Sequence, residues 1–315
     1  MGQEVGQYGA NSSLLDFIYG ITFEIWEERG VELIRQYYGE DIRVFALGSV
    51  TDGVEAVVEG TYATLEAFPD RLLLAEDVIW SDDTDGQYSS HRILSPMTNH
   101  GPSAYGAATG KAVKVRTIAD CFVQEGVITK EWLIRDTLPI VQQLGFDPLV
   151  VAQQQKQELT GLTKEYHAKE IARVDSESNH ELTDWAAQCL HARWVGADNL
   201  QDYYAPYAVS YPGPIDWCSG SDGIKQHGKQ VLGGLRPSSV RVDHIAVQPW
   251  GHHGQEVAAR WTMTVEHEGD YLGLSPKAER QAAILGSAHW RVTDNKIATE
   301  WLVFDGMGVL AQLVD

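Results

Sequence analysis

Two short acidic segments, EWLIRD at residues 131–136 and EWLVFD at residues 300–305, have the residue types needed for proton-transfer chemistry. Each reads as a β-strand, in which alternate side chains share a face, so Trp132 and Asp136 lie on the same side. Asp305 ends the second segment in the same way. If that face lines a pocket, burial beside an indole raises the pKa of the carboxyl group. Each aspartate could then act as an acid or a base near neutral pH.

The same two aspartates have a structural interpretation as well. Asp is a preferred N-cap residue, and the segment TLPIVQQLG, which has the pattern of a helix, begins directly after Asp136. The types of the residues leave both roles open, the proton-transfer group and the helix cap.

The two segments are part of a repeat that spans nearly the whole chain. The preceding residues, DCFVQEGVITK and HWRVTDNKIAT, align without a gap at an offset of 169 residues. We therefore predict two domains, residues 14–147 and 182–315, each about the size of an ordinary domain. A flexible arm, residues 1–13, precedes them, and the polar, Gln-rich segment 148–181 is predicted to be a helical linker.

The composition excludes several classes of function. With 24 basic and 44 acidic residues the formal charge is −20, which opposes binding to nucleic acid or to anionic lipid. No apolar run is long enough to cross a bilayer and the N-terminus lacks the pattern of a signal peptide, so we expect a cytoplasmic protein. The three cysteines are widely spaced and indicate neither a disulfide framework nor a zinc site.

The order of the predicted elements defines the fold class. Residues 14–38 and EAVVEGTYATLEAFPD have the pattern of helices, the second ended by Pro69. Strand-like segments follow, with a short turn at residues 124–126 that predicts a hairpin. Helices followed by an antiparallel sheet predict an α+β domain with a pocket between the two layers.

The segment GAATGKAVKVRTIADCFVQEGVITKEWLIRDTLPIVQQLG, residues 106–145, resembles the SnoaL-like polyketide cyclases of the nuclear-transport-factor-2-like superfamily. The resemblance implies tandem cone-shaped α+β domains. It also implies that Asp136 and Asp305 are the acid/base groups of an aldol-type ring closure that needs no cofactor. Hydrophobic, carbonyl-containing small molecules are the substrates that such a family would imply, and the fold by itself does not fix the function.

Further candidates for the pocket follow from the repeat and from the resemblance. His100 and His267 recur at matching places and could hydrogen-bond a substrate oxygen, or be loop residues without a role. Asp120 could form a second acid or pair with Arg116. The remaining predicted substrate-binding residues are His91, Tyr105, Trp132 and Trp301.

Other chemistries have little support in the sequence. The histidines of WGHH, residues 250–253, lack the HExxH pattern of a zinc site and are interpreted as a solvated turn. No nucleotide-binding or serine-hydrolase motif is present, so we predict no metal and no cofactor.

Three hypotheses about function remain open. The first is a polyketide cyclase-type enzyme of lyase or isomerase class. The second is a non-catalytic protein that binds a hydrophobic small molecule, and the third is an enzyme like ketosteroid isomerase or epoxide hydrolase. We expect the two domains to associate as an intramolecular pseudo-dimer through the outer faces of their sheets, and homodimers of the whole chain are a further expectation.

Overall fold

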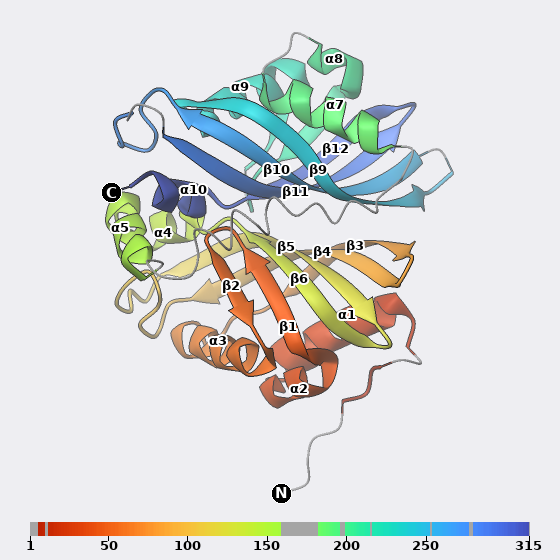
Figure 1. Ribbon diagram of the computed structural model, residues 1–315, viewed down its shortest axis with the longest axis vertical. Coiled ribbons are helices and arrows are strands. Elements are labelled where there is room, and N and C mark those ends of the chain that lie inside the picture. The colour runs from red at the N-terminus through yellow and green to blue at the C-terminus, as the bar shows by residue number, and fades with distance from the viewer. Residues whose placement is uncertain are drawn as a thin grey trace, which may run out of the picture.

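The computed structural model describes residues 6–9, 12–158, 182–195, 199–214, 216–252, 254–276 and 280–314. Within these residues the chain forms two six-stranded sheets, one in each half. The sheets face each other, and most of the helices cover their outer sides (Figure 1). The predicted fold class, tandem cone-shaped α+β domains of the nuclear-transport-factor-2-like kind, is confirmed.

The helices of the N-terminal half form where the apolar spacing predicted them. Ser13 caps the first helix by accepting a hydrogen bond from the backbone N–H of Asp16 at 3.2 Å. The helix that precedes Pro69 ends at Ala67, because proline cannot continue it. The elements are α1 (Leu14–Thr22), the π-helical turn η1 (Phe23–Glu27), the 3-10 turn η2 (Val31–Leu33), α2 (Ile34–Tyr37) and α3 (Val54–Ala67).

The first sheet has the strand order β2-β1-β6-β5-β4-β3. Its strands are β1 (Tyr38–Ala46), β2 (Ser49–Asp52), β3 (Leu74–Asp83), β4 (Gly86–Thr98), β5 (Ala112–Gln124) and β6 (Val127–Arg135). Strands β3 to β6 form the predicted antiparallel meander. Strands β1 and β2 were not predicted. Strand β1 pairs in parallel with β6, which carries the EWLIRD segment, and β2 pairs with β1 at the edge of the sheet.

The C-terminal half repeats this order, with a sheet that runs β8-β7-β12-β11-β10-β9. Its helices are α7 (Thr183–Trp194), α8 (Leu200–Tyr203) and α9 (Gly220–Leu232). Its strands are β7 (Tyr204–Tyr211), β8 (Cys218–Ser219), β9 (Leu235–Trp250), β10 (Gly254–His267), β11 (Gln281–Thr293) and β12 (Lys296–Phe304).

The strand registers show which residues of the two halves are equivalent. Asp120 pairs with Trp132 between β5 and β6, and His289 pairs with Trp301 between β11 and β12. Both pairs are separated by the offset of 169 residues that the sequence repeat has. Positions that share this offset in these strands are therefore structural equivalents.

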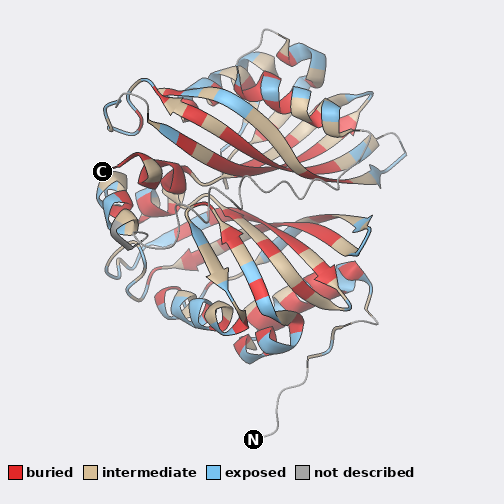
Figure 2. Cartoon of the chain, in the orientation of Figure 1, coloured by how far each residue is buried: buried red, intermediate tan, exposed pale blue. Residues whose placement is uncertain are grey.

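The two sheets pack against each other through the faces that point away from the helices. Buried residues concentrate along these facing surfaces (Figure 2), and Ile79 and Tyr88 from one half share a cluster with Ala246 and Ala258 from the other. The guanidinium of Arg260 lies 3.6 Å from the centre of the Trp132 ring. The guanidinium of Arg92 lies 3.9 Å from the centre of the Trp301 ring. Each domain therefore places an arginine over a tryptophan of the other domain.

Three short helices lie at one end of the molecule, where the halves meet (Figure 1). These are α4 (Leu138–Leu144), α5 (Pro148–Glu158) and α10 (Gly306–Leu313). Helix α5 forms the beginning of the predicted linker 148–181, and residues 159–181 lie outside the described part of the chain.

Candidate functional site

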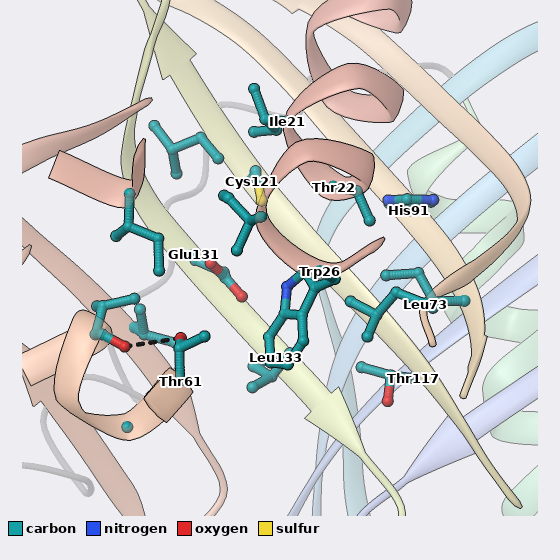
Figure 3. Close-up of a pocket in the computed structure, with 18 of the residues that line it drawn as sticks. Ile21, Thr22, Trp26, Thr61, Leu73, His91, Thr117, Cys121, Glu131 and Leu133 are labelled. Carbon is teal, nitrogen blue, oxygen red and sulfur yellow. Dashed lines mark hydrogen bonds between the residues drawn. The ribbon is translucent and has the colours of Figure 1, made fainter. Parts of the chain in front are cut away.

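A cavity of about 250 Å³ lies in the N-terminal domain, between its helices and the inner face of its sheet. Trp26 lies near its middle, whereas Glu131 and Thr117 lie toward opposite ends (Figure 3). Three neighbouring strands line its floor with alternate residues, namely His91, Ile93 and Ser95 of β4, Thr117, Ala119 and Cys121 of β5, and Glu131, Leu133 and Arg135 of β6.

The cavity therefore uses the face of the EWLIRD strand opposite to the one that carries Trp132 and Asp136. The predicted alternation of side chains along β6 is correct, and Glu131 and Arg135 share a face as expected. The condition that the aspartate face lines a pocket does not hold for this cavity. A different carboxyl group, that of Glu131, lies in it instead.

Glu131 is a buried acid in mostly apolar surroundings, with only 7% of its surface exposed. Burial raises its pKa to about 7, although a hydrogen bond from the Tyr38 hydroxyl and the charge of Arg135 both act in the opposite direction. A carboxyl group with such a pKa exchanges protons readily at neutral pH.

Glu300 stands at the equivalent position of the C-terminal domain, and it has more polar partners than Glu131. Arg193 forms an ion pair with it at 3.2 Å, and the Ser210 hydroxyl donates to it at 2.7 Å. The indole N–H of Trp290 donates at 3.2 Å, and the Tyr204 hydroxyl donates as well. Despite the burial, which raises it, these groups hold the pKa of Glu300 below its ordinary value.

Three of these four partners are missing around Glu131. Val44 pairs with Glu131 where Ser210 pairs with Glu300, and Cys121 pairs with Glu131 where Trp290 pairs with Glu300. The residue before Trp26 is Ile25, and the residue before Trp194 is Arg193. Ile25, Val44 and Cys121 all line the cavity. The first domain thus has a cavity beside an acid without an ion-pair partner, where the second has Arg193 and Trp290 in contact with a neutralised one.

Asp136 and Asp305 lie at the junction of the two halves, and each accepts hydrogen bonds from backbone N–H groups at the start of a helix. Asp305 is the N-cap residue of α10, and Asp136 directly precedes Thr137, the N-cap residue of α4. The Oδ1 atom of Asp305 accepts from the backbone N–H of Met307 in its own helix at 3.2 Å. It also accepts from the hydroxyl and the backbone N–H of Thr137 in the other half, at 2.7 and 3.3 Å. Asp136 does the same in reverse, accepting from Leu138 and from Gly306, both at 3.3 Å. The capping role that the sequence left open is therefore present, and it joins the two halves.

The surroundings of these aspartates favour the protonated acids. Burial and the neighbouring Asp305 raise the pKa of Asp136 to about 8, while the backbone hydrogen bonds lower it in part. Burial also raises the pKa of Asp305. Tyr105, predicted as a substrate-binding residue, lies nearby and hydrogen-bonds Arg135, which lines the cavity.

The two histidines predicted to recur, His100 and His267, are not structural equivalents. The backbone N–H of His267 donates to the carbonyl of Arg280, and the backbone N–H of Asn99 donates to the carbonyl of Lys111, the residue 169 positions before Arg280. His267 is therefore the structural equivalent of Asn99. The sequence comparison paired it with His100, which is one residue further along the chain. His100 is exposed and His267 is buried against the carbonyl of Leu274, and neither is among the residues that line the cavity.

Asp120, Trp132 and Trp301 lie between the two sheets rather than in the cavity. Asp120 is fully buried, where it accepts hydrogen bonds from Tyr88 and Ser90, and the Nε atom of Arg260 lies 3.7 Å from it. The predicted pairing of Asp120 with Arg116 is not found, because Arg116 pairs with Glu76 at 2.8 Å. The indoles stack on Phe45 and on Tyr211.

His91 is the predicted site residue that the structure places in the cavity wall. Its side chain is 2% exposed, and its Nε2 atom has no hydrogen-bond partner. Burial, helped by the charge of Arg92, lowers its pKa to about 3, so the ring is neutral at pH 7.

The sequence contained a feature that could have indicated Glu131, although Asp136 was chosen as the candidate acid of this strand. Glu131 and Glu300 occur at the same place in both copies, on the face opposite to Asp136 and Asp305. A buried acid kept in both halves marks the inner face of the strand, but only the position of the helices shows that this face is the inner one.

Comparison with known families agrees with this fold. The model of the family described as SnoaL-like polyketide cyclase matches residues 180–313. The resemblance stated from the sequence is thus confirmed, and the C-terminal half carries the family match although the EWLIRD copy suggested it first. The N-terminal half repeats the same arrangement of helices and sheet.

Solved structures with a similar fold each match about one domain of this chain. A SnoaL-like polyketide cyclase from Agrobacterium tumefaciens str. C58 is 15% identical, covering 42% of this chain and 99% of its own, with a TM-score of 0.36. TsrD from Streptomyces laurentii is 18% identical, with coverages of 43% and 96% and a TM-score of 0.38. A candidate polyketide cyclase from Acidithiobacillus ferrooxidans is 23% identical, with coverages of 42% and 95% and a TM-score of 0.37.

A search of curated proteins found no match to the chain. Among the described residues, no helix has both the length and the apolar character needed to span a membrane.

Proposed function

We propose that the cavity of the N-terminal domain binds a hydrophobic, carbonyl-containing small molecule and that Glu131 transfers protons to and from it. The reaction belongs to the cofactor-independent acid/base class that includes the ring closures of polyketide cyclases. One observation carries the proposal, namely that Glu131 is buried without a cationic partner at hydrogen-bond distance while its equivalent Glu300 is fully paired.

The chemistry follows from the two forms of one carboxyl group. The Glu131 carboxylate removes a proton from a carbon next to a carbonyl, which leaves an enolate on the ligand. The enolate carbon then attacks a second carbonyl of the same molecule and forms the new carbon–carbon bond. The resulting alkoxide takes the proton back from Glu131, so the carboxylate is regenerated and no oxidant or reductant is consumed.

His91 suits the supporting role in this reaction. Because its ring is neutral and its Nε2 atom has no protein partner, it can donate a hydrogen bond to the oxygen that gains charge. In this proposal Asp136 and Asp305 hold helices α4 and α10 together, and they are not the groups that move protons.

The proposal is tested by hydrogen–deuterium exchange at the carbon next to a ketone, followed by NMR in D₂O. The probes are 1-tetralone and 3-benzoylpropionate, and the proteins are the full chain, Glu131→Gln and Asp136→Asn. We expect Glu131→Gln to slow exchange by roughly 10²- to 10⁴-fold, the usual contribution of a general base, and Asp136→Asn to leave it within a few-fold.

The opposite pattern would return the acid/base role to Asp136, as the family resemblance implies. A probe that stabilises all three proteins and is exchanged by none would favour the second hypothesis, a small-molecule binding protein without chemistry.

A further inference from the structure

The end of the cavity opposite Glu131 contains two arginines without an acidic partner. Arg71 and Arg135 both line the cavity, and the Nε atom of each is buried without a hydrogen-bond partner. Arg71 is only 3% exposed. Among the residues that the structure describes, no carboxylate forms an ion pair with either guanidinium.

Two hydroxyl groups at the same end are also without partners. Thr117 stands directly beside Arg135 in the pairing of β5 with β6, and Ser95 lies diagonally across on β4. Thr117 is 3% exposed and Ser95 is fully buried, and the hydroxyl oxygen of each lacks a hydrogen-bond partner. Four side chains of the cavity wall therefore have unused polar atoms at one end, although buried polar groups are normally hydrogen-bonded.

The charges at this end are unfavourable without a ligand. Burial and the nearby charge of Arg135 lower the pKa of Arg71 to about 9, which reflects the cost of holding two cations in a desolvated site. An anion in contact with both guanidinium groups would remove that cost. The planar guanidinium binds carboxylates through two parallel hydrogen bonds, so a carboxylate fits a pair of arginines especially well.

In the C-terminal domain apolar side chains occupy the equivalent place. Phe304 stands in the position of Arg135, and Gly286 stands in that of Thr117. The ring of Trp261 fills the space above Gly286, where an added Cβ atom would lie 2.2 Å from it. The unpaired polar atoms are thus a feature of the first domain.

We propose that Arg71 and Arg135, with Thr117 and Ser95, bind a carboxylate group of the ligand. The inference rests on the proposed function, because it assigns a substrate class to the same cavity. Arg135 and Glu131 are four residues apart on one strand, so their Cα atoms are about 13 Å apart at about 3.3 Å per residue. The ligand class is therefore a hydrophobic keto acid, with its carboxylate at the arginine end and its reactive carbon near Glu131.

The test uses benzoate as the probe, because it is a small aromatic carboxylate, and benzamide as its neutral match. Phenyl phosphate distinguishes a phosphoryl group from a carboxylate. Thermal shift and calorimetry in chloride-free buffer compare the full chain with Arg71→Met, Arg135→Phe and Glu131→Gln. Arg135→Phe installs the residue that the C-terminal domain already accommodates at this position. Arg236→Met removes an exposed arginine of the other domain and is the charge-matched control.

We expect benzoate, but not benzamide, to stabilise the full chain, Glu131→Gln and Arg236→Met. In Arg71→Met and Arg135→Phe the dissociation constant should rise roughly tenfold or more, the effect of losing a hydrogen bond to a charged group. Without benzoate these two variants should melt at or above the temperature of the full chain, because each loses a buried charge that has no carboxylate partner. A variant that merely misfolds would melt lower.

Equal stabilisation by benzoate and benzamide would overturn the proposal, as would benzoate binding that survives both arginine substitutions. If phenyl phosphate stabilises the protein more than benzoate does, the proposal of a carboxylate ligand is wrong and the site binds a phosphoryl group. The two proposals fail separately. Benzoate binding that depends on the arginines supports the anion site even if Glu131→Gln leaves proton exchange unchanged.

Discussion

Glu131 and Glu300 occupy the same position in the two domains, and only Glu300 is neutralised by an arginine. Its partner Arg193 directly precedes Trp194, as Ile25 directly precedes Trp26 in the first domain. A duplicated chain has thus kept one buried acid in each copy and built a salt-bridged core around the second. The first copy has an open cavity in the same place, which is where we propose that binding and chemistry occur.

This difference predicts that the same substitution lowers the free energy of unfolding much more in the second domain than in the first. Glu300→Gln leaves Arg193 buried without a counter-charge and should lower the free energy of unfolding by about 3–5 kcal/mol. Glu131→Gln removes an unpaired buried acid and should change the free energy of unfolding by less than about 1 kcal/mol, or raise it. Urea denaturation followed by tryptophan fluorescence measures both. Similar losses in the two variants would mean that Glu131 has a counter-charge in solution.

The stability lost in Glu300→Gln should depend on pH. The pKa of Glu300 is lowered on folding, so its contribution to stability is present above the unfolded value, about 4.3, and is lost as the pH falls through the folded one. Removing Glu300 should therefore cost least in acid. A loss of stability for Glu300→Gln that is the same at pH 3 and pH 7 would argue against the ion pair as its cause.

Asp136→Asn should preserve the hydrogen bonds to the helix ends and remove the ionisable group. The amide oxygen of Asn can still accept from Leu138 and Gly306, as Asp136 does at 3.3 Å. The folded pKa of Asp136 is about 8 and the unfolded value is about 3.9, so the folded state binds more protons between them and wild-type stability falls as the pH rises. The variant should flatten this decline and melt higher at pH 8, by roughly 2–4 °C per kcal/mol gained.

Melting curves from pH 4 to pH 9 check this prediction, with Asp136→Ala as the control that loses the cap as well. Asp136→Ala should be less stable than Asp136→Asn by about 1 kcal/mol or more, the usual cost of a lost cap. A variant Asp136→Asn that melts lower than the wild type throughout this range would contradict the interpretation of Asp136 as a capping residue.

Filling the cavity should abolish binding without unfolding the protein. The double variant Ile93→Trp with Thr117→Gly copies Trp261 and Gly286, which stand at the equivalent positions of the C-terminal domain. Because the second domain packs an indole in this arrangement, the variant should fold with a melting temperature close to that of the wild type. Calorimetry with benzoate and 1-tetralone should show no heat of binding. Undiminished binding would place the ligand elsewhere.

The sequence predicted the fold well because the repeat is free of gaps through β5 and β6 and their equivalents β11 and β12. The residues that end in EWLIRD and EWLVFD keep one offset through two strands, and the register of β5 and β6 matches that of β11 and β12. Strands β1 and β2 were missed because they follow directly on the short helix that ends at Tyr37. The pairing of β1 with β6, and of β2 with β1, is set by tertiary contacts that no local pattern encodes.

The site was harder to predict, for a physical reason that β6 makes plain. The alternation of side chains along the strand correctly places Glu131 and Asp136 on opposite faces. However, each face carries one carboxyl group and at least one large apolar residue, so the two faces look alike in the sequence. Which face is the inner one depends on where α1 and α3 pack, far away in the sequence. Arg71 and Arg135 had no local signal, because an arginine without a partner is recognised only once its surroundings are known.

The pKa of Glu131 tests the central claim most directly. Selective ¹³C labelling of glutamate side chains, with Glu131→Gln used for assignment and Glu300 as an internal comparison, allows both acids to be titrated by NMR. We predict a midpoint near 7 for Glu131 and one below the ordinary glutamate value for Glu300. A Glu131 carboxyl that titrates near the ordinary 4.3 would contradict the account, because it would lack the raised pKa that a buried, unpaired acid requires.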